Sequence, residues 1–233
     1  MLKHGKKYRT AVKKVQKEIG SSTDQVLDKI KAFSYVNFDE SVDVDVNLGI
    51  DPSKGEQIVR GSVLLPHGRG KPITIIVFAK GDYADKAQQA GADYVGTEDL
   101  VKKINDGWMD FNYAVATPDM MGLVGKLAKI LGPRGLLPTA KMGTVTFDVE
   151  AIIADLKKGR AFFKNDKQGI VHFSVGKVSF ENKGLRQNLQ TFLKALRAAK
   201  PSAAKGKFLK KISLSSTMGI GFVINPDELL NLE

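Results

Sequence analysis

Several residue types that support common kinds of chemistry are scarce in this 233-residue sequence. There is no cysteine, which excludes disulfides, thiolate metal sites and thiol nucleophiles and fits a reducing compartment. The three histidines, His4, His67 and His172, have no carboxylate at metal-ligand spacing, so we expect no metal site. No apolar run approaches the roughly 20 residues of a membrane span, and the basic stretch 1–17 is not followed by the apolar segment of a signal peptide. We therefore expect a cytoplasmic protein that does not enter a membrane.

The signatures of the common enzyme classes are missing as well. No G-x-S-x-G motif is present, and the apolar run 73–79 is followed by Gly81 alone, not by the three glycines that let a backbone approach a pyrophosphate. Residues 68–71 resemble a phosphate-binding loop but lack the hydroxyl residue after the lysine, so a hinge explains them better. We predict no catalytic residues and no cofactor. An enzyme or nucleotide-binding protein that uses the same segment stays open as the alternative.

The sequence has a large excess of basic residues, and that excess is unevenly distributed. The net charge is +11, from 36 Lys and Arg against 25 Asp and Glu. Residues 1–67 and 160–233 together carry 24 basic and 14 acidic residues, whereas residues 68–159 carry 12 and 11. A basic domain favours a polyanionic partner such as nucleic acid. A merely solubilising basic surface is the alternative.

The stretch 60–79 indicates where one domain gives way to another. Before residue 66, apolar and polar residues alternate, as on a sheet with one face in solvent; after residue 72 the run is apolar almost throughout, as in a parallel strand covered on both faces. Two prolines and two glycines lie between them and interrupt both strands. Gly159 is the expected point of return. We predict a discontinuous domain of residues 1–67 and 160–233, with residues 68–159 inserted into it.

The two parts show different element patterns. The outer segments combine amphipathic helices with alternating strands, which is typical of one antiparallel sheet with helices on a face, a split βαβ arrangement. The helices are expected at 1–20, 22–33 and 185–196, and the strands at 42–48, 58–65, 160–164, 170–177, 208–216 and 222–224. The insert alternates short strands with helices, which predicts a small Rossmann-like parallel sheet. Its strands are expected at 73–79, 94–95, 111–116 and 144–147, and its helices at 83–90, 97–104, 118–131 and 149–156, with a Gly/Pro-rich loop at 132–138. The fold class is therefore α+β with an α/β insert.

Three groups of residues in the discontinuous domain suit RNA binding. Recognition of RNA uses Lys and Arg for phosphates, exposed aromatic rings for stacking, and backbone or short polar groups for sugar and base edges. Lys164, Asn165 and Lys167 flank a hairpin turn, Phe38 begins a strand where it need not be buried, and residues 217–219 form a turn. Phe38 and Met218 could equally be core residues.

Seven sequence motifs occur in order along nearly the whole chain. They are VNLGIDP at 46–52, VRGSV running into LPHG at 59–68, AGAD at 90–93, TPDM at 117–120, LGPRGLLP at 131–138, NDK at 165–167 and STMG at 216–219. With these motifs the chain closely resembles the L-one family of bacterial ribosomal large-subunit proteins. The resemblance implies a split-βαβ RNA-binding domain with a Rossmann-like insert, binding to the 23S rRNA stalk of the 50S subunit, assistance in releasing deacylated exit-site tRNA, and repression of the protein's own operon through its mRNA.

The resemblance also implies which residues contact RNA. Thr217, Met218 and Gly219 match the family's RNA-contact turn. Phe38, Lys164, Asn165, Lys167 and His172 match further contact regions. Two departures from the family pattern stand out: Ile220 replaces the usual proline after the turn, and Thr139-Ala140 replaces Asn-Pro in the insert.

Overall fold

The computed structural model describes residues 5–15 and 22–225 of the chain, which forms two compact units. The first unit comprises residues 1–70 and 161–233 and is called the composite domain below; the second, residues 71–160, is called the insert. These boundaries lie three residues and one residue later than those expected from the sequence. Among the described residues, no helix is long and apolar enough to span a bilayer.

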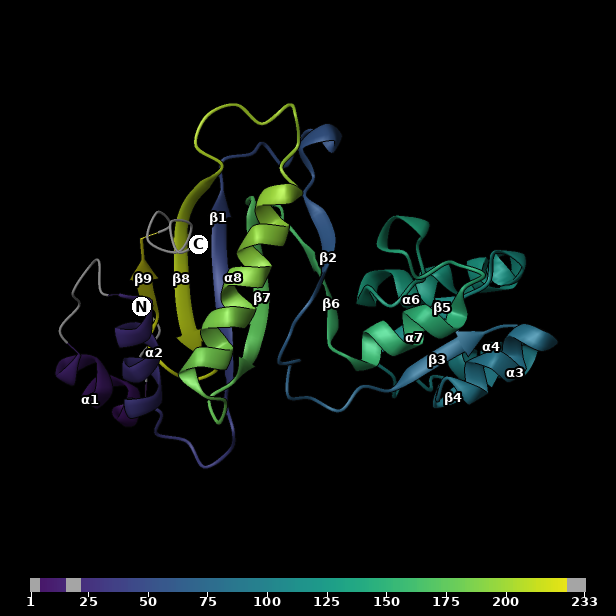
Figure 1. The fold of residues 1–233 in the computed structure, drawn as a ribbon, viewed down its shortest axis with the longest axis horizontal. Coiled ribbons are helices and arrows are strands. Elements are labelled where there is room, and N and C mark those ends of the chain that lie inside the picture. The colour runs from purple at the N-terminus through teal and green to yellow at the C-terminus, as the bar shows by residue number, and fades with distance from the viewer. Residues whose placement is uncertain (1–4, 16–21, 226–233) are drawn as a thin grey trace. The chain divides into compact units, whose positions relative to one another are not determined.

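A four-stranded antiparallel sheet forms the centre of the composite domain (Figure 1). Its order is β7 (Ile170–Lys177), β1 (Ser41–Leu48), β8 (Leu209–Ser216) and β9 (Phe222–Ile224). Along β1, Val42, Val44 and Val46 are fully buried while the residues between them are partly exposed, so one face is packed and the other is open. A separate two-stranded sheet joins β2 (Arg60–Leu64) to β6 (Arg160–Lys164), and the short helix η1 (Gly55–Gln57) precedes β2.

Helices cover the packed face of the sheet. Helix α8 (Asn182–Ala198) runs across it, and its fully buried Phe192 ring stacks on Phe173 of β7, with centroids 4.2 Å apart and planes 6° apart. Helix α2 (Thr23–Ala32) lies beside α8 and begins at Ser22, where the predicted capping box with Gln25 is confirmed. Helix α1 (Lys6–Lys14) covers only part of the helix expected at 1–20, and residues 1–4 and 16–20 of that prediction lie outside the described residues.

The insert is a three-stranded parallel sheet with helices on both faces. Strand β3 (Ile75–Phe78) lies between β4 (Tyr94–Gly96) and β5 (Tyr113–Ala116), and all four of its residues are fully buried, as an apolar central strand requires. One face packs against α4 (Glu98–Asn105) and the helical stretch that follows β5; on the other, α3 (Asp82–Gln89) contacts α7 (Val149–Lys157). The fold class predicted from the sequence is therefore confirmed.

Two expectations for the insert need correction. The strand expected at 144–147 is reduced to a single parallel bridge between Val145 and Ala116. The stretch after β5 is a succession of short helical turns: η2 (Pro118–Met120), α5 (Met121–Val124), η3 (Gly125–Leu127) and α6 (Ala128–Arg134), with η4 (Ala140–Met142) further on. It continues through residues 132–134, which were expected to be loop, because Gly135 at φ 71° provides the left-handed residue that ends a helix.

The segment leaving β2 is fixed to the composite domain before it enters the insert. Asn188 of α8 is fully buried; its Oδ1 accepts from the His67 backbone N–H at 3.1 Å, and its Nδ2 donates to the carbonyls of Gly68 at 3.0 Å and Val175 at 2.8 Å. Gly68 and Gly70 both have positive φ, 65° and 67°, which L side chains rarely adopt. Asn188 therefore holds the first half of the predicted hinge in place.

Candidate RNA-binding surface

The predicted contact turn at 217–219 lies beside residues 34–40 at one end of the central sheet. Strand β1 begins at Ser41, and its antiparallel partners β7 and β8 end there, with Ser41 opposite Lys177 and Val42 opposite Ser216. Antiparallel pairing thus brings together two segments that are far apart in the sequence.

Hydrogen bonds fix the backbone of this turn on both sides. The Thr217 N–H donates to the Ser41 carbonyl at 3.1 Å, and the Thr217 hydroxyl accepts from the Ser41 N–H at 3.0 Å. The Tyr35 hydroxyl donates to the Met218 carbonyl at 2.6 Å. These hydrogen bonds tie the turn to residues 35 and 41, although Ile220 and not proline follows it.

Glu40 is a residue of this site that the sequence did not reveal. It is 1% exposed, yet its carboxylate accepts from the Met218 N–H at 2.8 Å through Oε1 and from the Ser34 hydroxyl at 2.7 Å through Oε2. A buried carboxylate is tolerated only when it is hydrogen-bonded in this way. No sequence signal separates Glu40 from an ordinary surface acid, because its role depends on the turn that folds over it.

Gly219 and Ile220 are both determined by packing. A Cβ on Gly219 would overlap the Ser216 hydroxyl oxygen, so either that hydroxyl or the turn must move to admit a side chain. Ile220 is 6% exposed and belongs to the core of the composite domain. Where the family usually has proline, this chain therefore has a buried apolar anchor.

Two large apolar side chains project from this end of the sheet into solvent. Phe38 is 56% exposed and Met218 is 52% exposed, so neither is a core residue. Phe38 was expected to begin a strand. It lies instead in a bend, three residues before β1. The bend forms because the Asp39 carboxylate accepts from the Ser179 N–H and hydroxyl at 3.1 and 2.8 Å, which ties the segment to the residues after β7.

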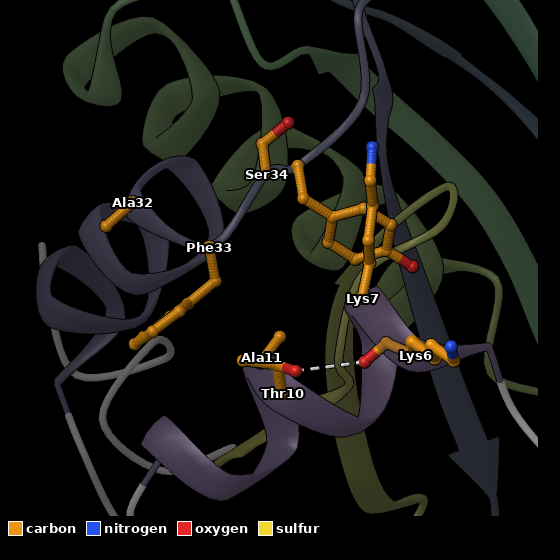
Figure 2. A pocket seen from close by; sticks show the side chains of 8 residues that line it. Lys6, Lys7, Thr10, Ala11, Ala32, Phe33 and Ser34 are labelled. Atoms are coloured by element: carbon orange, nitrogen blue, oxygen red, sulfur yellow. Dashed lines mark hydrogen bonds between the residues drawn. The ribbon is translucent and has the colours of Figure 1, made fainter.

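A pocket of about 460 Å³ adjoins the same end of the domain (Figure 2). Lys6 and Lys7 of α1 line it, together with Phe33 and Tyr35 from the segment that follows α2. Because Tyr35 also holds the Met218 carbonyl, the pocket wall and the turn share a residue. No sequence pattern marks Lys6, Lys7 or Tyr35 as contact residues, because their proximity to the turn depends on the fold.

The predicted residues at 164–167 lie at the opposite end of the sheet. Lys164 and Lys167 are exposed and line a groove of about 440 Å³ together with Pro52 and Ile58. Asn165 is 6% exposed; its Oδ1 accepts from the Val59 N–H at 2.8 Å, and its Nδ2 donates to the Asp166 carbonyl at 2.8 Å. The Asn165 amide therefore joins β2 to the hairpin turn, and the two lysines are the accessible groups.

His172 lies on the open face of the sheet between two carboxylates. Its Nδ1 is 2.6 Å from Oδ1 of Asp45, its cross-strand neighbour, and its Nε2 is 3.6 Å from Oδ2 of Asp166. The hydrogen bond to Asp45 raises the pKa of His172. The pKa of Asp166 is lowered, first by the hydrogen bond that its carboxylate accepts from the Ile170 N–H.

The eight predicted residues thus form two groups. One comprises Phe38 and residues 217–219, and the other comprises Lys164, Asn165, Lys167 and His172. Most of β1 separates Phe38 and residues 217–219 from residues 164–167, a span on the order of 25 Å, whereas His172 lies opposite Asp45, about halfway along β1. Between them the open face carries short polar side chains, among them Asp43, Asn47, Ser213 and Ser215, all partly exposed. Among the described residues, no cluster of His, Asp and Glu has the arrangement of a metal site.

Comparison with known proteins agrees with these motifs. A family model described as "Ribosomal protein L1p/L10e family" matches residues 30–220. The large ribosomal subunit protein uL1 of Maridesulfovibrio salexigens is 48% identical over 226 residues, which cover 97% of this chain and 96% of that protein.

Proposed function

The chain belongs to the ribosomal protein L1p/L10e family, and from this membership we propose that its composite domain binds the 23S rRNA stalk of the large subunit directly. A member of this family is a structural, non-enzymatic constituent of the cytoplasmic ribosome, which removes the enzyme alternative.

The observation that carries the proposal is the pair of exposed apolar side chains on a fixed support. Phe38 and Met218 are both more than half exposed, while the backbone beneath Met218 is held by Glu40, Ser41 and Tyr35. Exposed aromatic rings stack on unpaired bases, and a preordered turn loses little conformational entropy on binding. This end of the sheet is therefore the proposed specific contact.

The second group supplies electrostatic contact. Lys164 and Lys167 are exposed, whereas any positive charge on His172 is balanced by the Asp45 and Asp166 carboxylates beside it. Cations at this end neutralise phosphates without reading sequence. An RNA that reaches both groups crosses the open face, where serine hydroxyls suit 2′-hydroxyl contacts. Asn165 contributes by shaping the turn.

We further propose the two finer roles that the family resemblance implies, repression of the protein's own operon and assistance in releasing exit-site tRNA. One RNA-binding surface can hold either the rRNA stalk or an rRNA-like site in the protein's own mRNA, but not both, so free protein would repress its operon when rRNA is scarce. Assistance in releasing exit-site tRNA requires the subunit-bound protein to reach that tRNA.

Truncation of the exposed side chains in the full chain tests the proposal. We expect Phe38→Ala to weaken binding to a large-subunit rRNA stalk fragment by about 5- to 150-fold, the range for loss of one base–aromatic stack, and Met218→Ala by about tenfold. Leu64 is the matched control, because it is also a large apolar side chain, 45% exposed, in the same domain but on β2. The measurement is the dissociation constant at about 0.15 M salt, alongside unrelated RNA of equal length. Equal losses for Leu64→Ala and Phe38→Ala would contradict a localised site.

A further inference from the structure

The near-neutral charge of the insert hides a segregation of charge within it. Residues 120–147 contain four basic residues and no acidic residue, whereas the remainder of residues 71–160 carries 8 basic and 11 acidic residues. The four are Lys126, Lys129, Arg134 and Lys141, and all are exposed. A total of +1 for the insert therefore combines a basic segment with an acidic remainder.

None of these four cations is neutralised within the described part of the chain. The ion pairs among described residues involve other side chains, such as Arg160 with Asp155 at 3.1 Å in the same unit. Four unpaired cations without an interspersed acid produce a positive potential that attracts an anionic partner.

The helical stretch 118–134 carries three of the four cations, and several of its exposed residues are small. Met120, Val124, Leu127 and Leu131 recur at helical spacing and are buried against the sheet. The opposite side presents small or basic residues, all exposed: Gly122, Gly125, Lys126, Lys129, Gly132 and Pro133. The long exposed side chains of this stretch are the two lysines and Arg134.

Neither packing nor backbone conformation within the protein requires glycine at the three glycine positions of this face. A Cβ built on Gly122, Gly125 or Gly132 would meet no atom within 4 Å, and none of the three has a positive φ. Glycine lowers helix stability relative to alanine, so its use here is explained by close approach of an external backbone.

The chemistry of the face favours RNA over a protein partner. Protein interfaces centre on buried aromatic and large apolar anchors, and this face has none. Contact with a nucleic-acid backbone needs only cations and close approach. We propose that the outer face of residues 122–134 in the insert is a second RNA-binding surface, which holds a phosphate backbone between Lys126, Lys129 and Arg134 against the bare glycine positions. The proposal rests on the proposed ribosomal function and assigns the insert its own RNA contact.

Tethered cleavage in assembled large subunits tests this surface, and the absence of native cysteine makes the labelling site-specific. Pro133→Cys keeps all the cations, and Asp99→Cys on α4 is the control, an exposed position in the same insert. An iron chelate on each cysteine cleaves nearby RNA backbone. We expect cleavage from position 133 and at least fivefold less from position 99. Cuts in rRNA or in a bound deacylated tRNA identify the source of the backbone.

Replacing the glycines with alanine distinguishes an RNA contact from a face that is only exposed to solvent, because only an RNA contact would lose cleavage. In the Gly122→Ala/Gly125→Ala variant we expect a higher Tm together with at least threefold less cleavage from position 133. Equal cleavage from both positions, no RNA cleavage from position 133, or a raised Tm with undiminished cleavage would each overturn the proposal. Incorporation into subunits is scored separately. If Phe38→Ala and Met218→Ala incorporate as well as the unaltered chain, the composite-domain site fails, whatever the cleavage shows.

Discussion

Gly219 leaves space for the Ser216 hydroxyl, which lies directly beside it. Its φ is not in the left-handed region, but a Cβ would overlap the Ser216 hydroxyl oxygen. The turn closes tightly because the Gly219 N–H donates to the Ser216 carbonyl at 3.1 Å, directly below the exposed Met218. A side chain added at Gly219 is therefore expected to displace Met218 and so alter the proposed RNA-binding surface.

Gly219→Ala should destabilise the chain by about 1–3 kcal/mol, the usual cost of forcing atoms into a filled site. Denaturant unfolding measures the free energy. Gly221→Ala is the matched control, since a Cβ at Gly221 meets no atom within 4 Å. Adding Ser216→Ala to Gly219→Ala removes the hydroxyl and should restore part of the loss. If the double variant is as unstable as the sum of the singles, the clash is not the cause.

The His172 pair makes the open face pH-dependent. The pKa of His172 is raised above 6.5 by Asp45, so its contribution to stability is present below pH 6.5 and is lost as pH rises through the folded pKa. The pKa of Asp166 is lowered below 3.8, so its contribution is present above pH 3.8 and is lost as pH falls through the folded pKa. Between about pH 3.8 and pH 6.5, both His172 and Asp166 therefore contribute to stability.

His172→Asn should remove the dependence of stability and of RNA affinity on pH between about 6 and 8, because His172 is the titrating group on this face. The measurements are the unfolding free energy and the dissociation constant across that interval. His67 is the comparison, because it lies beside Gln187 away from the open face. A pH dependence that persists in His172→Asn and disappears in His67→Asn would refute this assignment.

At the scale of elements, helix α8 serves both the core and the connection to the insert. Phe192 stacks on β7, while Asn188 on the same helix holds the backbone of residues 67 and 68. The side chain of Asn188 is fully buried and makes three hydrogen bonds, so the helix fixes the point at which the chain leaves the composite domain.

Asn188→Ala should therefore strongly lower the free energy of unfolding. It leaves the part-buried His67 N–H and Gly68 carbonyl and the buried Val175 carbonyl without their partner, and a buried group left so costs about 1–3 kcal/mol. We expect a loss of several kcal/mol in the unfolding free energy and faster amide hydrogen exchange at His67. Gln187→Ala, which removes an exposed contact to the same His67, should change stability by less than about 0.5 kcal/mol. Similar effects of the two variants would show that the buried network is not the anchor.

At the scale of the whole molecule, the charge distribution predicts the salt dependence of RNA binding. Lys164→Ala/Lys167→Ala should lower the slope of log affinity against log salt by about 1.4–1.8, the effect of two lost phosphate contacts. Affinity measured between about 0.05 and 0.2 M salt gives that slope. Lys194→Ala is the control, because Lys194 is exposed on α8, which covers the opposite face of the sheet. An unchanged slope for the double variant would remove the second group from the footprint.

Much of the architecture follows from local sequence patterns. The alternation in Val42, Val44 and Val46 marks a half-buried strand, and the apolar run at 75–78 marks a strand covered on both faces. Burial in a strand repeats every two residues and in a helix about every 3.6, so neighbouring residues alone reveal these elements. The motifs that occur in order along the chain likewise identified the family from sequence alone.

Tertiary structure alone decided how the candidate site is built. Met218 and Glu40 are hydrogen-bonded across 178 positions of sequence, and no local pattern shows that a buried carboxylate supports the exposed turn. Asn165 and Lys164 are adjacent in sequence, yet packing turns one inward to hold Val59 and leaves the other in solvent. The physical reason is that secondary structure depends on the period of burial within a segment, whereas the accessibility of one polar side chain depends on which distant segment folds against it.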